Sequence, residues 1–333
     1  MTPPHVATPS AVATAHATAT DAWPPLPLAE WQATYDTLHL WAQVIGKVRL
    51  ALAPMQNHWW QVPLYVTGRG LTTSPMPYGD HVVEARFDFV DHALSLETST
   101  GETRRIALAP RSVADFYHEV MAALDALGVH VRIWPHPVEM PDAIPFERDE
   151  THHAYDAEAA QRCWRVLVEV DRVLHAFRGR FVGKCSPVHF WWGAFDLACT
   201  RFSGRRAPPH PGGIPNCPDY VAREGYSHEC ISAGWWPGGG AVAEPAFYAY
   251  AYPEPAGFAT AHVAPSAAFY STDFREFILP YEAVRSADDP DRALLEFLQT
   301  TYEAGADLGG WDRAALERPP GYDPRRLESD RAS

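Results

Sequence analysis

The chain has 333 residues and a formal net charge of −14, with 47% hydrophobic and 20% charged positions. This composition is typical of a globular protein, and the length allows one large core or two domains of roughly 150 residues each. The negative charge argues against non-specific electrostatic binding to nucleic acid or anionic lipid. No stretch of the sequence approaches the ~18 consecutive apolar residues of a membrane-spanning helix.

The cysteines and the two ends of the chain indicate a cytoplasmic protein. Five cysteines, an odd number without C-x-x-C spacing, predict neither a disulfide framework nor a zinc knuckle. Residues 1–22 are rich in Ala, Thr and Pro, and they predict a disordered tail rather than a signal peptide. Residues 318–333 predict a second disordered tail.

Four amphipathic helices are predicted, each from apolar residues at helical spacing or from a residue that starts or stops a helix. The first covers residues 28–45 and ends at Gly46, and the second runs from a capping box of Ser112 and Asp115 to Gly128. The third covers residues 156–178 and ends at Gly179. The last helix starts at Asp289 and Pro290.

Extended segments with alternating side chains predict antiparallel strands. Residues 247–252 alternate aromatic side chains with alanine, which suits a half-buried strand. A strand that begins at His189 would place Trp191 and Arg201 on the same face as His189, with Asp196 on the other face. We therefore expect the α+β class, with antiparallel sheets packed against amphipathic helices.

Two segments of the chain resemble each other. VIGKVRLALAPMQNHWW (44–60) and FVGKCSPVHFWW (181–192) both lead from a helical stretch through hydrophobic-Gly-Lys to a Trp pair. When the Trp pairs are aligned, Arg69 falls on Arg201, although alignment of the lysines needs a gap. We interpret this as an internal duplication with α+β halves at 23–150 and 151–317; chance similarity between two aromatic strands is the alternative.

The motifs NHWWQVPLYVTGRGLTTSP and FVGKCSPVHFWWGAFDLACTRFSGRRAPP resemble an uncharacterised bacterial family catalogued as domain of unknown function 5996. The resemblance covers the chain from Trp23 to about Glu317. It implies no activity, cofactor or site residue, so the function has to be argued from the side chains.

Lys47 and Lys184 are the only lysines among 27 basic residues. An ammonium is a compact donor whose pKa shifts readily on burial, which a guanidinium does not match. We expect the two lysines to face a shared cleft, where they hold an anion or where one acts as a nucleophile or base. The alternative is a structural ion pair for each lysine at a helix end.

The other candidate residues lie close to the two Trp pairs. His189, beside aromatic rings, is the candidate general base, and a hydrogen-bonded core histidine is the alternative. Arginines suit bidentate binding of an anion, and the Gly-rich segment 234–240 predicts a hinged flap that carries two tryptophans. The predicted ligand-binding residues are Asn57, Arg69, Trp191, Arg201, Arg205, Trp235 and Trp236.

A metal site is a weaker expectation. His228, Glu229 and Cys230 have side chains of the right types, but further ligands would have to come from elsewhere in the chain. The sequence contains neither a nucleotide-binding glycine loop nor a G-x-S-x-G elbow.

These observations predict an aromatic-walled pocket between the two halves. The favoured function is an enzyme that acts on a small anionic metabolite, with Lys and Arg as anion anchors and His189 as the acid–base group. The alternatives are a non-catalytic protein that binds a small aromatic molecule, and a metalloprotein that uses His228 and its neighbours. The sequence leaves the identity of any cofactor open.

Overall fold

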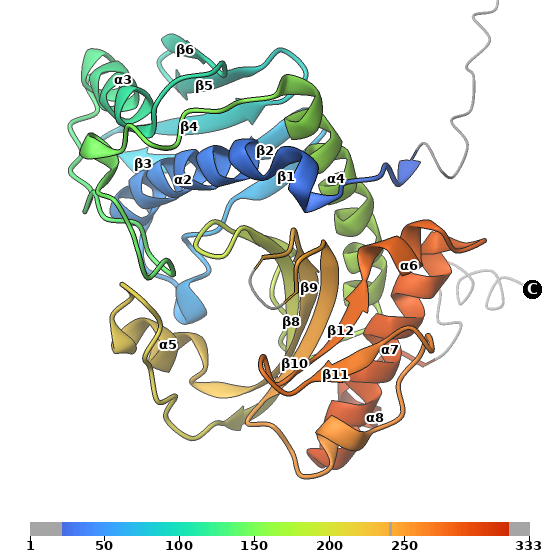
Figure 1. Cartoon of the computed structure of the whole chain (residues 1–333). Coiled ribbons are helices and arrows are strands. Elements are labelled where there is room, and N and C mark those ends of the chain that lie inside the picture. Colours follow the sequence, from blue (N-terminus) through green and yellow to red (C-terminus); the bar gives the residue numbers. More distant parts are fainter. Residues whose placement is uncertain (1–21, 240–241, 320–333) are drawn as a thin grey trace, which may run out of the picture.

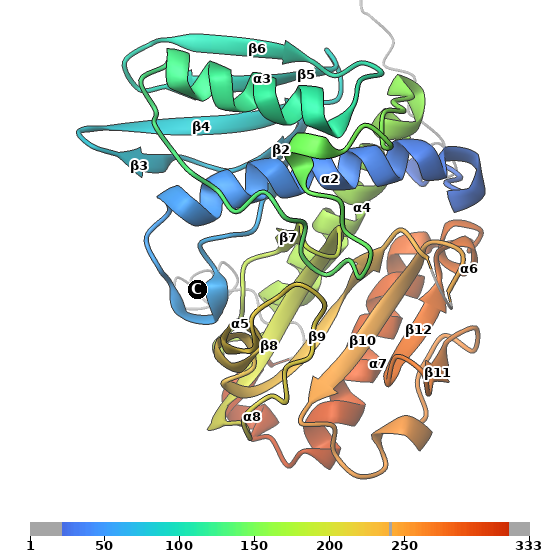
Figure 2. The same cartoon turned by 60° about the vertical axis from the view of Figure 1, so that its left-hand side comes forward.

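The computed structural model describes residues 22–239 and 242–319, so the predicted tails lie almost entirely outside the described residues. Two six-stranded antiparallel sheets, together with seven helices in the described part of the chain, confirm the α+β class (Figure 1). Helix α2 (Leu28–Leu52) runs between the two sheets in both views (Figures 1 and 2).

The first sheet has the order β1-β2-β4-β5-β6, with β3 paired to β4. Its strands are β1 (Tyr65–Thr67), β2 (Gly70–Thr72), β3 (Met76–Tyr78), β4 (His81–Asp88), β5 (Ala93–Thr98) and β6 (Thr103–Ala107). Helices α2 and α3 (Val113–Ala126) cover one face of this sheet, and the rings of Trp41 and Phe116 stack between these helices with centroids 4.7 Å apart. Because β4 alternates buried and more exposed residues, the opposite face is open to solvent.

The second sheet has the order β11-β12-β10-β9-β8-β7. Its strands are β7 (His189–Trp191), β8 (Asp196–Arg206), β9 (His228–Trp236), β10 (Ala246–Tyr252), β11 (Phe269–Ser271) and β12 (Glu276–Pro280). The helices of this part are α4 (Ala157–Gly179), α5 (Asp219–Gly225), α6 (Tyr281–Arg285), α7 (Pro290–Leu308) and α8 (Arg313–Leu316). Helices α4 and α7 pack on one face of the sheet, while α2 passes across one end of its strands and α5 lies by the opposite face (Figure 2).

Local capping explains three of the predicted helices, which the structure confirms. The side chains of Ser112, Asp156 and Asp289 each accept a hydrogen bond from a backbone N–H in the first turn of α3, α4 and α7. The alternating segment 247–252 is likewise confirmed as strand β10.

The prediction that the first helix ends at Gly46 is wrong, because α2 continues to Leu52. Gly46 lies against the side chain of Trp192, where an added Cβ would be 2.3 Å from ring atoms. The glycine therefore serves close packing between α2 and the second sheet, and it does not terminate the helix.

The single strand expected from His189 to Arg201 is also wrong. The chain turns between β7 and β8, with Phe195 in the left-handed backbone region at φ 57°, and the two strands pair antiparallel. Strand β8 consequently starts a new alternation at Asp196, which lines the cavity described below, whereas Arg201 is directed to the helix-covered side of the sheet.

The flap predicted for residues 234–240 is wrong for its first three residues, which form part of a strand. Gly234, Trp235 and Trp236 belong to β9, in which alternation sends the two tryptophans to opposite faces of the sheet. Gly240 lies outside the described residues.

The internal duplication is not confirmed. Both parts of the chain have a helix, six strands and a later helix, but the aligned residues differ in local structure. Lys47 lies inside α2, whereas Lys184 follows the end of α4; Arg69 is exposed in a turn, whereas Arg201 is buried in β8. The two sheets are joined by reciprocal backbone hydrogen bonds between Leu64 and Phe190, both of 2.9 Å.

Within the described residues, none of the helices has both the length and the apolar character required to cross a lipid bilayer.

Candidate functional site

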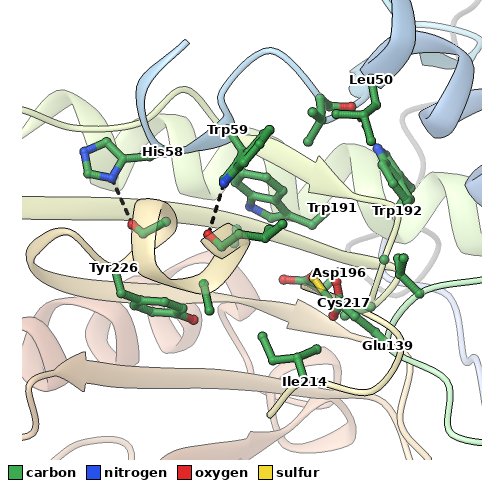
Figure 3. A pocket seen from close by; sticks show the side chains of 18 of the residues that line it. Leu50, His58, Trp59, Glu139, Trp191, Trp192, Asp196, Ile214, Cys217 and Tyr226 are labelled. Carbon is green, nitrogen blue, oxygen red and sulfur yellow. Dashed lines mark hydrogen bonds between the residues drawn. The ribbon is translucent and has the colours of Figure 1, made fainter. Parts of the chain in front are cut away.

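A cavity of about 760 Å³ lies on the face of the second sheet that α4 and α7 leave uncovered. Strands β8, β9, β10 and β12 form its floor. Its roof combines the end of α2, residues 58–62, residues 132–139 and the loop that contains α5 (Figure 3). Segments far apart in the sequence thus enclose a volume typical of small-molecule sites.

Aromatic side chains are prominent in the walls. Two hydrogen bonds fix the roof to α5: the indole N–H of Trp59 donates to the Val221 carbonyl at 3.0 Å, and His58 Nδ1 donates to the Gly225 carbonyl at 2.9 Å (Figure 3). The aromatic lining residues are Trp59, Trp60, Trp134, Trp191, Trp192, Phe202, Tyr220, Tyr226, Trp236, Tyr248, Tyr250 and Phe274.

Three carboxyl groups, those of Glu139, Asp196 and Glu276, line the cavity. Asp196 accepts a hydrogen bond from the hydroxyl of Tyr248. That hydroxyl reaches across β9 at Gly234, where an added Cβ would lie 2.7 Å from it. The missing side chain of Gly234 therefore opens the path between β10 and β8.

Desolvation by the surrounding protein raises the pKa of each of these carboxyl groups to about 7, although the Glu139 residue itself is exposed. The charge of Glu139 adds to the effect at Asp196, and that of Asp196 adds to it at Glu276. The Glu139 side chain is accessible from the cavity, and its carboxyl rests on Gly193, where a Cβ would be 2.0 Å from Oε1. Within residues 22–239 and 242–319, none of the three carboxyl groups has a salt-bridge partner.

Hydroxyl groups continue the polar floor. Thr200 Oγ1 and Ser232 Oγ are 2.9 Å apart on neighbouring strands, and Tyr250 lies opposite Ser232 on β10. The hydroxyls of Tyr226 and Tyr250 are 2.8 Å apart. Burial raises the pKa of Tyr250 far above its usual value, so these phenols stay neutral hydrogen-bonding groups.

Lys47 lines the cavity from α2. Its side chain is only 4% exposed, and its ammonium nitrogen lies 4.9 Å from the ring centre of Trp134. Burial lowers the pKa of Lys47 to about 8, and the nearby Cys217 thiol opposes this shift.

Lys184 is not among the residues that line the cavity. Its ammonium nitrogen is 2.5 Å from His58 Nε2, which accepts because Nδ1 of the same ring donates to the Gly225 carbonyl. The two lysines therefore lie in separate environments: Lys47 lines the cavity, whereas Lys184 is not a lining residue and its ammonium contacts the lining residue His58.

His189 is fully buried and also lies outside the cavity lining. Its Nε2 is 3.4 Å from the Tyr65 hydroxyl, and among the residues that the structure describes its Nδ1 has no hydrogen-bond partner. Burial, followed by the charges of Arg49 and Arg178, lowers the pKa of His189 to about 3. The imidazole is thus neutral at physiological pH, and its acid–base role stays a prediction without contact to this cavity.

The predicted arginine ligands lie away from the cavity. Arg69 pairs with Asp88 at 2.6 Å on the surface. The Arg201 guanidinium is packed 3.4 Å from the centre of the Phe177 ring and donates to the Phe177 carbonyl at 2.5 Å. Arg205 forms a salt bridge of 2.7 Å with Glu229.

The remaining predicted residues divide between the cavity and other places. Trp191, Trp236 and Cys230 line the cavity, whereas Trp235 is buried in the core and Asn57 is exposed. His228 and Glu229 are not lining residues. In the described part of the chain, no three His, Cys, Asp or Glu side chains are grouped so as to hold a metal ion.

Sequence reasoning missed the carboxyl groups and tyrosines of the floor. A signal existed for Asp196, a lone carboxylate within the apolar run AFDLAC, and for Tyr248 and Tyr250, which alternation places on one face of β10. Glu139 gave no such signal, because it lies in an irregular segment.

Comparison with known proteins gives a family and no function. The family model described as "Family of unknown function (DUF5996)" matches residues 23–318. No curated protein and no solved structure matches the chain. Because the match spans nearly the whole chain, the protein belongs to the DUF5996 family.

Proposed function

We propose that the protein binds a small, ring-bearing organic molecule in the cavity between the second sheet and α2. The single observation that carries the proposal is the aromatic-walled cavity of about 760 Å³ with polar groups gathered on its floor. Small-molecule sites have this character: mostly apolar and aromatic walls, with a few polar groups that fix orientation.

The lining carries groups of both signs, with no large excess of positive charge to hold an anion, and it therefore favours a neutral ligand. The cationic lining residues are Lys47 and Arg132, and three carboxyl groups face the same space. A metabolite with a negative charge, as expected from the sequence, would have to contact Lys47 and stay clear of Asp196 and Glu139. We therefore propose an aromatic molecule without a net negative charge.

A catalytic role has one specific observation in its favour. Glu139 and Asp196 face one cavity with pKa values raised to about 7, and acid–base catalysis near neutral pH requires such values. The structure supports this role for the carboxyl groups rather than for His189, which lies outside the cavity lining.

Binding is tested with 1-naphthalenemethanol, a neutral ring-bearing probe, by isothermal titration calorimetry. Ala51→Trp adds bulk at an exposed residue of the cavity rim, whereas Ala33→Trp adds the same bulk at an exposed residue of α2 that is not a lining residue. We expect Ala51→Trp to weaken binding by at least about tenfold and Ala33→Trp to leave it unchanged. Equal affinity of the two variants, or no binding to the wild type, would refute the proposal.

A further inference from the structure

Lys47 is a buried lysine whose side-chain nitrogen is available to a ligand in the cavity. The side chain is 4% exposed, and among the described residues it has neither a salt bridge nor a hydrogen bond. Lysine is almost never this deeply buried without a partner, because desolvation of an unpaired charge is costly. The ammonium nitrogen faces the cavity over Trp134.

Lys184 supplies an internal contrast. Its ammonium donates to His58 Nε2 and lies 5.0 Å from the ring centre of Phe202. A ligand in the cavity would meet the amine of Lys47, whereas the amine of Lys184 is already engaged behind the wall. The two lysines of the chain thus differ in availability as well as in position.

We propose that Lys47 forms an imine with an aldehyde or ketone group of the ring-bearing ligand. This inference rests on the proposed function, since it places the carbonyl compound in the same cavity. A carbonyl compound suits the lining better than an anion does, because it carries no charge toward Glu139 and Asp196.

The chemistry balances without any redox partner. The neutral amine nitrogen of Lys47 bonds to the carbonyl carbon, and one of its two protons passes to the carbonyl oxygen, which becomes the hydroxyl of a carbinolamine. That hydroxyl takes up a proton and leaves as water, the nitrogen gives up its remaining proton, and a C=N bond replaces the C=O bond. At neutral pH a sizeable fraction of the amine is available for attack, because burial has lowered its pKa to about 8.

Glu139 brings a titratable carboxyl group to the same cavity as Lys47. Both groups act on the pKa of the Cys217 thiol, which the charge of Glu139 raises and that of Lys47 lowers. Figure 3 shows Glu139, Cys217 and Asp196 side by side in the cavity. With a pKa of about 7, the Glu139 carboxyl can exchange protons with water in the cavity near neutral pH, and this water can carry a proton to the departing hydroxyl.

Reductive trapping tests the inference on the wild-type protein. The chain is treated with 1-naphthaldehyde and sodium cyanoborohydride, and the modified peptides are mapped by mass spectrometry; with two lysines in the sequence, assignment is direct. We expect a reduced adduct on Lys47 that forms at least about tenfold faster than on Lys184. Excess 1-naphthalenemethanol should slow the reaction at Lys47 alone.

Variants provide the matched control. Lys184→Arg should keep the fast adduct, and Lys47→Arg should lose it while its circular dichroism spectrum stays native. Labelling of Lys47 no faster than that of Lys184, or labelling of Lys47 that the alcohol does not slow, overturns the inference. If the alcohol binds but no Lys47 adduct forms, the imine fails and the proposed function stands; if the alcohol does not bind, the proposed function fails as well.

Discussion

The two sheets of this protein have the same number of strands and use their faces differently. In the first sheet, β4 alternates: Val83, Ala85 and Phe87 are buried under helices, and the residues between them look outward. In the second sheet, β9 is buried almost continuously, because α7 covers one face and the cavity roof covers the other. Strand β9 is thus buried on both faces, but one of these faces carries polar or small side chains. This combination indicates that the polar face lines an enclosed site.

The largest expected effect separates the two faces of β9. Trp235 is fully buried on the helix-covered side, so Trp235→Ala should lower the free energy of unfolding by about 3–5 kcal/mol. Trp236, on the cavity side, is less buried, and Trp236→Ala should cost clearly less stability while weakening probe binding. Urea denaturation followed by circular dichroism measures both variants. Equal losses of stability would contradict the assignment of the two faces.

The second prediction is that the buried Asp196 carboxyl, on the cavity face of β8, makes the stability of the protein depend on pH. The pKa of Asp196 is raised from 3.8 to about 7, so the folded protein holds a proton that the unfolded chain releases in this range. Stability should therefore fall as pH rises from about 4 to about 7, by up to about 1.4 kcal/mol per pH unit from this group.

Asp196→Asn removes this contribution and keeps an oxygen for the Tyr248 hydroxyl. Relative to the wild type, the variant should gain stability as pH rises through the same window. Urea denaturation at a series of pH values measures the difference, and parallel curves for the two proteins would show that Asp196 ionises normally. No comparable dependence is expected from Ser95, a residue of the first sheet that does not titrate.

A smaller effect is expected where α2 crosses onto the second sheet. Gly46→Ala places a Cβ 2.3 Å from the Trp192 ring, which is held by a hydrogen bond of 2.8 Å to the Val62 carbonyl. Overpacking should cost about 1–3 kcal/mol, more than the gain of roughly 1 kcal/mol in helix propensity. Gly179→Ala is the control, since no atom of the described residues lies within 4 Å of a Cβ there. Thermal unfolding should show a lower midpoint for Gly46→Ala alone.

The smallest effect tests whether the first sheet is independent of the cavity. Ser112 accepts a hydrogen bond of 3.0 Å from the Asp115 N–H at the start of α3. Ser112→Ala should lower stability by about 1 kcal/mol and leave the affinity for 1-naphthalenemethanol unchanged. A change in affinity measured by calorimetry would show that the first sheet and the cavity are coupled.

Much of the fold could be predicted because its signals are local. The caps at Ser112, Asp156 and Asp289 act within one helical turn, and the alternation of residues 247–252 needs no distant partner. The α+β class follows from such features, whereas the family was indicated by the resemblance of the two Trp-pair motifs. Gly46 misled the prediction because its role is contact with Trp192, which is 146 positions away in the sequence.

Only the tertiary structure decided which side chains share the cavity. Asp196 moved to the cavity face because the chain turns before β8, and Glu139 joined it from an irregular segment that no periodicity describes. The sequence by itself singled out Lys47 and Lys184 as a pair. In the folded protein, Lys47 lines the cavity, whereas Lys184 forms a hydrogen bond with His58. Local propensity determines elements over a few residues, whereas the cavity depends on the order and register of strands that are distant in the chain.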